Sequence, residues 1–237
     1  MELLLNAVIP KDRSFAPEDH TAFSPQQAAV CDGASISYAS ATWADLLATR
    51  FVANPDFSSN WVDDAIRDYE SQHDAATMSW SAAASYARGS FSTLLGVRYD
   101  ESTRDVRLLS IGDSVAFLLD GDSLKESWPI TSANDFPVRP ELIGTRREDN
   151  LRFLEQPLLE QHMKVYRLAA YQDPRILCMT DALAEWALRD VNTIAALCKL
   201  KTTEDLAQLV SAEQAARRLR YDDCTLLSLR FPAVTRA

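Results

Sequence analysis

Apolar residues along this chain fall into blocks with strand spacing and blocks with helix spacing. Short apolar runs at 2–8 and 27–31 predict two strands, separated by a turn-rich segment that contains three prolines. Beyond them, apolar residues recur every three or four positions, which predicts a long helical region. The positions with helix spacing are Trp43, Leu46, Leu47 and Phe51, then Trp61, Ala65, Ile66 and Tyr69, then Met78, Ala82 and Tyr86.

The spacing then returns to that of strands. Three consecutive apolar runs predict strands at 91–99, 106–111 and 115–119. Short polar connections at 100–103 and 112–114 join them, and such connections are typical of hairpins. We therefore expect a meander of antiparallel strands, with Asp113 at a hairpin tip.

The segment 128–160 has the least regular pattern in the chain. It contains four prolines and mixed charge, which predicts a loop or flap. A loop of that length inside a compact domain is more often functional than not. We expect it to shape the entrance to a substrate site.

The last third of the chain predicts a strand, two helices and a closing strand. The first strand is expected at 176–179 and the last at 225–231. A second helix is expected to start at Thr202 or Thr203, since acidic residues in its first turn favour the helix dipole. The helix directly after Asp181 should bury one face, formed by Leu183, Trp186, Ala187 and Val191.

The order of these blocks predicts one α+β domain over residues 1–237, with largely antiparallel sheets covered by helices. A chain of this length with 47% hydrophobic residues can bury about 70% of its unfolded surface, as one large domain does. A doubly wound parallel fold is disfavoured, because the six glycines form no GxGxxG or Walker loop.

Charge and hydropathy limit the classes of partner that we expect this protein to bind. A net charge of -10 argues against nucleic acid, which proteins bind through an excess of Lys and Arg. The apolar stretch near the start is too short for a signal peptide, and no later stretch could cross a bilayer. We expect a cytoplasmic protein with no membrane partner.

Isolated aspartates at the ends of apolar runs are the main chemical signal. A carboxylate at a strand edge is costly unless a cation or hydrogen bonds compensate for its charge. Four such placements in one chain suggest a divalent metal centre. These residues are Asp32, Asp113, Asp181 and Asp222.

Each aspartate also has a simpler explanation. Asp113 could cap its own turn, and Asp181 could cap the helix that follows it. Asp222 with Asp223, and the run from Glu18 to His20, could be ordinary solvated residues. The joint occurrence of several motifs in order favours the metal site.

Five short motifs resemble, in order, those of the metal-dependent type 2C (PPM) Ser/Thr protein phosphatases, of which this chain would be a divergent, bacterial-like member. The motifs are Pro17-Glu18-Asp19, Cys31-Asp32-Gly33, Gly112-Asp113-Ser114, Thr180-Asp181 and Asp222-Asp223-Cys224-Thr225. The resemblance implies a four-layer α-β-β-α sandwich with two mainly antiparallel sheets flanked by helices. It also implies a binuclear Mn²⁺ or Mg²⁺ centre at one end of that sandwich.

The resemblance assigns roles to individual residues. Asp32 would bridge two metal ions, and the Gly33 carbonyl would bind one of them. Asp181 and Asp222 would bind the other ion, while Glu18 would act through bound water.

Two further assignments follow from the same resemblance. Asp113 with Asp181 could hold a third, weaker ion. Arg13 is the candidate for the family's phosphate-binding arginine, although it lies one residue further from Glu18 than in the family.

These roles imply an enzyme that hydrolyses phosphoserine and phosphothreonine in phosphoprotein substrates, by a water activated at the two metal ions. The alternative is a pseudo-phosphatase, a binding or regulatory module with little turnover. Ala34 stands where some relatives have a histidine, the paired glycines after Gly33 are missing, and Ala182 replaces a glycine.

A serine hydrolase that uses Ser114 of the Gly-Asp-Ser motif is a third reading. We disfavour it, because that motif lies between two predicted strands in mid-chain and the sequence has no Asp-x-x-His partner.

Overall fold

Two antiparallel sheets form the centre of the molecule. The computed structural model describes residues 1–12 and 14–233, and at 156 and 157 the backbone alone. The first sheet has the order β1 (Glu2–Ile9), β12 (Cys224–Arg230), β11 (Pro174–Met179), β7 (Val115–Asp120), β8 (Ser123–Trp128). The second has the order β10 (Met163–Arg167), β6 (Asp105–Ile111), β5 (Leu94–Asp100), β3 (Gln27–Cys31), β2 (His20–Phe23).

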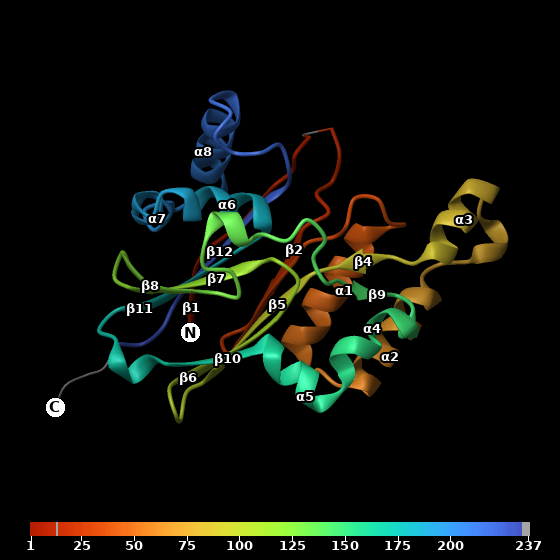
Figure 1. Ribbon diagram of the computed structural model, residues 1–237, viewed down its shortest axis with the longest axis horizontal. Coiled ribbons are helices and arrows are strands. Elements are labelled where there is room, and N and C mark those ends of the chain that lie inside the picture. The colour runs from red at the N-terminus through yellow and green to blue at the C-terminus, as the bar shows by residue number, and fades with distance from the viewer. Residues whose placement is uncertain (13, 234–237) are drawn as a thin grey trace.

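Helices cover the outer face of each sheet (Figure 1). The first sheet carries α6 (Asp181–Arg189), α7 (Asn192–Leu197) and α8 (Thr203–Ala215). The second sheet carries α1 (Ser40–Ala53), α2 (Ser59–Ser71), α4 (Arg147–Leu154) and α5 (Gln156–Leu159). The layers are therefore helix, sheet, sheet, helix, and both the expected α+β class and the four-layer sandwich are confirmed.

Successive side chains of each strand point to opposite faces of its sheet, so the two sheets and their helices enclose three hydrophobic cores. Side chains such as Val30, Leu95 and Ile176 fill the space between the two sheets. The residues between them point outward and meet the helices, as Leu94 does on one side and Phe117 on the other. Strands buried on both faces explain why the sequence shows continuous apolar runs there.

Specific caps and contacts fix the covering helices. Ser58 caps α2, accepting a hydrogen bond from the Trp61 amide at 3.3 Å. Thr202 and Asp205 form a reciprocal capping box at the start of α8, which confirms the expected beginning of that helix. The Trp43 indole of α1 donates to the Ile143 carbonyl at 2.8 Å and fixes the two-stranded pair β4 (Phe91–Ser92) and β9 (Ile143–Gly144).

The expected three-stranded meander is wrong at its second connection. β5 and β6 do form a hairpin, but β7 belongs to the other sheet. Residues 112–114 therefore carry the chain from one sheet to the other. Gly112 permits this, because its φ is 111° and a Cβ there would lie 2.6 Å from the Thr93 side chain.

The expected loop at 128–160 is wrong in its second half. Residues 147–159 form α4 and α5, and the Phe153 side chain is fully buried against the second sheet's helical layer. The Asn150 side chain holds the start of α4 to β9, accepting from the Gly144 amide at 2.8 Å and donating to its carbonyl at 2.9 Å.

Other differences concern exposed or edge segments. Val191 is 56% exposed because α6 ends at Arg189, so it does not share the buried face as expected. Met78 precedes α3 (Trp80–Arg88), a helix that contains no buried residue and projects from the second sheet's side in Figure 1. The sequence reading also missed the short or polar strands β2, β8 and β10.

Within the described ranges 1–12 and 14–233, no helix has the length and hydropathy needed to span a membrane.

Candidate metal centre

The ends of four segments bring the predicted aspartates to one end of the sandwich. Asp32 follows β3, Asp113 lies in the crossover between the sheets, Asp181 begins α6 directly after β11, and Asp222 precedes β12. Their mutual proximity is visible in the pKa of Asp32. Burial raises this pKa well above its usual range, and the charges of the surrounding aspartates raise it further: Asp19, Asp181, Asp113 and Asp222.

The other carboxyl groups of the cluster respond in the same way. Burial, together with the negative charge of Asp181, raises the pKa of Asp113 to about 7, although its backbone and Arg220 oppose the rise. Burial and Asp181 also raise the pKa of Asp222. Carboxylates therefore outnumber the cations in this cluster, and Arg220 offsets only part of their negative charge.

Hydrogen bonds hold the backbone of Asp32 in place. The Asp32 amide donates to the Thr93 hydroxyl at 2.9 Å, and the Thr93 amide donates back to the Asp32 carbonyl at 2.9 Å. The Thr93 hydroxyl also lies 3.0 Å from that of Ser114, in the crossover that carries Asp113. Two of the predicted site segments are thus tied together through one threonine.

Gly33 occupies a position with no room for a side chain. A Cβ there would lie 2.8 Å from the Glu18 carbonyl oxygen and 2.9 Å from the Ser40 backbone. The Gly33 amide donates to the Glu18 carbonyl at 3.2 Å. This close approach explains why glycine follows Asp32, and it brings the first motif beside the second.

Glu18 has local partners for both carboxylate oxygens. One oxygen accepts from Lys11 Nζ at 2.6 Å and from the Ser35 hydroxyl, and the other accepts from the Ser40 hydroxyl at 2.8 Å. Burial opposes ionisation of Glu18, but these hydrogen bonds outweigh it and lower its pKa. Glu18 therefore stays ionised under conditions in which its aspartate neighbours tend to hold protons.

Asp19 is a buried member of the site that the sequence reading did not assign. Its side chain is 2% exposed and accepts from the hydroxyls of Thr180 at 3.0 Å and Thr225 at 2.7 Å. Burial raises its pKa to about 8, with a further contribution from Asp223. The explanation of residues 18–20 as ordinary solvated residues is therefore wrong for Asp19. Its position next to Glu18 in the first motif was the sequence signal that could have identified it.

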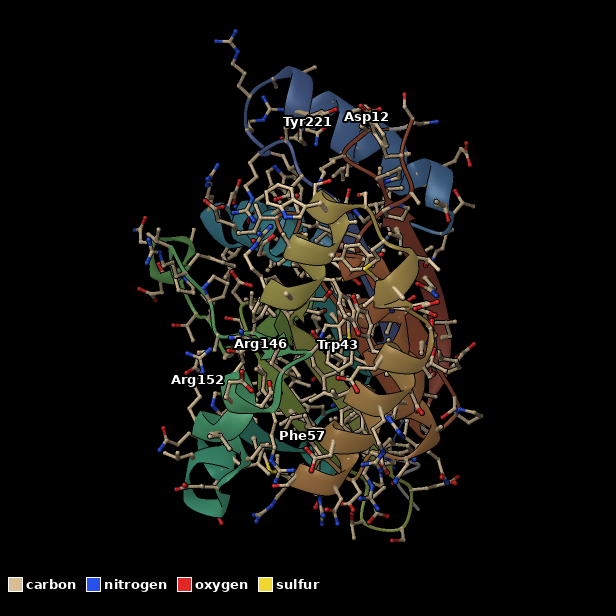
Figure 2. The ribbon with its side chains drawn as sticks, turned by 90° about the vertical axis from the view of Figure 1, so that its right-hand side faces the viewer. Asp12, Trp43, Phe57, Arg146, Arg152 and Tyr221 are labelled. Carbon is tan, nitrogen blue, oxygen red and sulfur yellow. The ribbon has the colours of Figure 1, made fainter. Side chains whose placement is uncertain are left out.

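Asp223 is a second residue that the sequence reading left without a role. One of its oxygens accepts from the Lys11 amide at 2.6 Å and the other from the Glu18 amide at 2.7 Å. The loop before β2 is thereby fixed to the start of β12. Figure 2 shows the neighbours of these segments, Asp12 and Tyr221, together at one end of the molecule.

Arg220 is the third missed residue and the main cation of the cluster among the described residues. Its guanidinium group pairs with Asp181, lies 3.6 Å from Asp222 Oδ2, and lies 3.5 Å from Glu185 Oε2. Its position two residues before Asp222 gave no indication of where the side chain would point. Asp181 also accepts from the Ala182 amide at 2.5 Å, while Thr180 is the N-cap residue of α6.

The structure does not arrange these side chains as a finished ligand sphere. Across residues 1–12 and 14–233, no three His, Cys, Asp or Glu side chains converge as ligands of a single ion. Arg13, the predicted phosphate-binding residue, lies outside the described residues.

Comparisons with known proteins identify the fold. No protein-family model matches the sequence, and no curated protein does so either. Solved structures do match over nearly their whole length. A bacterial serine phosphatase is 15% identical, with a TM-score of 0.63, and the match covers 98% of this chain and 100% of that one.

Two other solved structures give the same result. The Mycobacterium tuberculosis serine/threonine phosphatase PstP/Ppp is 19% identical, with a TM-score of 0.58 over 96% of this chain and 98% of its own. The catalytic domain of PstP in complex with two manganese ions is 18% identical, with a TM-score of 0.55 over 97% and 99% of the two chains. The resemblance read from the five motifs is confirmed at the level of the fold: the chain has the architecture of the bacterial type 2C Ser/Thr phosphatases and is a divergent example of it.

Proposed function

We propose that this protein hydrolyses phosphoserine and phosphothreonine in proteins with the aid of Mn²⁺ or Mg²⁺. The observation that carries the proposal is that Asp113, Asp181 and Asp222 lie close enough to Asp32, at one end of a phosphatase fold, for their charges to raise its pKa. The similar structures named serine/threonine phosphatases, one of them with two manganese ions, support the same activity.

The chemistry of the donors fits hard divalent cations. The side chains of the cluster are carboxylates, and oxygen is the ligand atom that Mg²⁺ and Mn²⁺ prefer. The raised pKa values of Asp32, Asp113 and Asp222 mark a place where added positive charge is favourable. We infer that these three residues, Asp181 and the Gly33 carbonyl would hold the ions, with Glu18 acting through water.

Bound divalent ions would supply Lewis acidity, which favours an attacking water and neutralises charge on the phosphoryl oxygens. In the reaction, a water oxygen bonds to phosphorus while the bond to the serine or threonine oxygen breaks, and that oxygen takes up a proton. The chain itself positions the groups. Asp223 fixes the loop that carries Glu18, and Thr93 fixes Asp32.

We propose that Arg13 contacts the phosphoryl group, as the resemblance implies. Its loop is anchored on both sides, because Lys11 and Glu18 each donate a backbone hydrogen bond to Asp223. Guanidinium groups suit phosphate because they bind it through two parallel hydrogen bonds.

The contacts of Ser114 do not support a role for it as the nucleophile of a serine hydrolase. Its side chain is 1% exposed, and its hydroxyl lies 3.0 Å from Thr93 rather than beside a general base.

Phosphate release from phosphothreonine and phosphoserine peptides tests the proposal. We expect release in the presence of Mn²⁺ and none in excess chelator, with recovery when Mn²⁺ is restored. Release that continues unchanged in chelator would contradict a metal-dependent mechanism.

A pseudo-phosphatase is the second candidate, favoured by one specific observation. Arg220 already pairs with Asp181 and lies near Asp222, so a permanent internal cation could take over the role of one ion. Calorimetric binding of Mn²⁺ without any peptide turnover would support this candidate over the enzyme.

A further inference from the structure

A cavity of about 550 Å³ lies at the end of the molecule away from the aspartates. It opens where α1 has ended and α2 begins, over the outer face of β5 and β6. Figure 2 shows Phe57, one of its lining residues, at the end opposite Asp12 and Tyr221. Its volume is typical of sites for small molecules.

Two arginines stand on the floor of this cavity. Arg98 of β5 and Arg107 of β6 are direct partners in the register of the hairpin. Their neighbours Val97, Val106 and Leu108 point into the core between the sheets, so both arginines face the helical side. Like charges directly opposite each other on a sheet are unfavourable.

Neither arginine is neutralised by its surroundings. Neither forms an ion pair or a side-chain hydrogen bond with the part of the chain that the structure describes. Among the described residues that line the cavity, Asp56 is the one that is acidic. The pairing of the two arginines in register places two positive charges side by side on one face of the sheet.

The start of α2 adds to the positive potential. Ser58, Ser59 and Asn60, which form the cap and first turn of this 13-residue helix, line the cavity. The first backbone amides of a helix have no acceptor within the helix, and its dipole is positive at this end.

The remaining walls are apolar. Phe51, Phe57, Leu109, Leu154, Leu159 and Met163 line them. The Phe51 ring lies directly over Gly96, where a Cβ would come within 2.3 Å of it. The absence of a side chain at Gly96 therefore lets Phe51 pack closely on the sheet. Met163 is 45% exposed at the cavity mouth.

We propose that this cavity binds a small amphipathic anion, a carboxylate or phosphate monoester with an apolar body. The anionic head would bind Arg98 and Arg107 and face the start of α2, and the apolar body would lie against Phe51 and Leu159. The site is separate from the proposed metal centre, so binding there can be measured without reference to phosphatase activity.

Isothermal titration calorimetry of the full chain with octanoate and octyl phosphate tests the proposal. Titrations are run in chelator, so that octyl phosphate is not hydrolysed, and the uncharged octanol serves as the ligand control. We expect at least one of the two anions to bind with 1:1 stoichiometry and about tenfold or more tighter than octanol. The stronger of the two anions identifies the head group.

Variants assign the binding to the arginine pair. The double change Arg98→Gln with Arg107→Gln should weaken anion binding about tenfold or more, whereas Arg139→Gln, an exposed arginine outside the lining, should leave it unchanged. Arg107→Glu places an acidic group opposite Arg98 and should abolish anion binding with no loss of thermal stability.

Several outcomes would overturn the proposal. They are no binding of either anion, equal affinity for octanol, and unchanged anion affinity in a double variant whose thermal unfolding matches that of the natural chain.

Discussion

At one end of this molecule Asp32 lies near enough to Asp113, Asp181 and Asp222 for their charges to raise its pKa, and at the other end two arginines are paired across β5 and β6. Asp113 is buried, Asp222 is partly exposed, and burial with repulsion between the carboxylates raises the pKa of Asp32, Asp113 and Asp222. The arginines are exposed to solvent, which screens their repulsion. The difference shows that burial decides how strongly a cluster of like charge needs a counter-ion.

The two ends also differ in whether other residues of the chain neutralise the charge of the cluster. The aspartate end contains Arg220, which pairs with Asp181, whereas Arg98 and Arg107 have no such partner within the described residues. An internal partner lets a buried cluster fold without an ion, but it competes with any ion that binds there. The following predictions test this contrast.

The largest effect is expected from Asp32→Ala. If Asp32 contacts both metal ions, its removal should lower Mn²⁺-dependent phosphate release at least about 10²–10³-fold. The fold should survive, because the change relieves repulsion with Asp113 and Asp181. Peptide turnover and thermal unfolding measure the two expectations.

The matched control is Glu101→Gln, which removes an exposed carboxylate from the β5–β6 turn and should leave turnover unchanged. Full metal-dependent turnover in Asp32→Ala would mean that the site is assigned to the wrong residues.

The second prediction concerns pH and the metal-free protein. The folded pKa values of Asp113, about 7, and Asp19, about 8, lie above those of unfolded aspartate, so the folded state binds more protons between these limits. The contribution of each group is greatest below about pH 4 and is lost as pH rises from there through its folded pKa. For Asp113, a shift of about three units corresponds to a loss on the order of 4 kcal/mol.

Chemical unfolding in chelator across this pH range measures the effect, after subtraction of the same series for Asp113→Asn. A metal-free protein whose free energy of unfolding rises steadily from pH 5 to 8 would contradict the raised pKa values.

Metal binding should stabilise the aspartate end by a smaller amount. At a free Mn²⁺ concentration of 100 times its dissociation constant, the gain is about 2.7 kcal/mol, or roughly 5–11 °C in a chain of this size. Differential scanning calorimetry with Mn²⁺ and with chelator measures it, and Na⁺ at equal ionic strength is the control. No shift at saturating Mn²⁺ would argue against a resident ion.

Arg220→Gln should tighten Mn²⁺ binding by about tenfold if Asp181 and Asp222 are ligands, because the guanidinium group lies on the oxygens that would bind the ion. The metal-free variant should be less stable, since it loses the internal cation. Calorimetric titration with Mn²⁺ measures the affinity, and Arg139→Gln again provides a neutral control. Weaker Mn²⁺ binding would instead make Arg220 a supporting residue of the centre.

The smallest effect is expected at the other end of the molecule. Arg98→Gln removes the like-charge contact with Arg107 and should raise the free energy of unfolding by roughly 0.2–1 kcal/mol at low salt. The gain should disappear in 1 M salt, because screening already removes the repulsion there. A stability loss would show that Arg98 has a partner of its own.

Much of the fold could be predicted because the strands are buried on both faces. Their continuous apolar runs, such as those of β7 and β11, are clear without any structure. The crossover at Gly112 could not be predicted, because a three-residue Gly-Asp-Ser connection suits a hairpin and a change of sheet equally well. The strands β2, β8 and β10 lie at sheet edges, where half-polar sequences carry little signal.

The residues of the candidate site likewise include some that the sequence indicates and some that it does not. The proximity of Asp113, Asp181 and Asp222 to Asp32 could be predicted because each aspartate lies at an end of an apolar run, and so at a strand edge. Asp19 and Asp223 have the same residue type but act through hydrogen bonds to distant segments, as in the bond from Thr225 to Asp19. Arg220 could not be predicted, since only the fold determines that its side chain turns toward Asp181.

The hydrogen bonds of Asp223 to Lys11 and Glu18 span 212 and 205 positions of the chain, and β1 pairs with β12 alongside them. During synthesis, therefore, a ribosome must release β12 before the loop near Glu18 can reach its final position. Fragments that end before Asp223 would lack this anchor, so the loop near Glu18 would be among the last parts of the molecule to reach its final position.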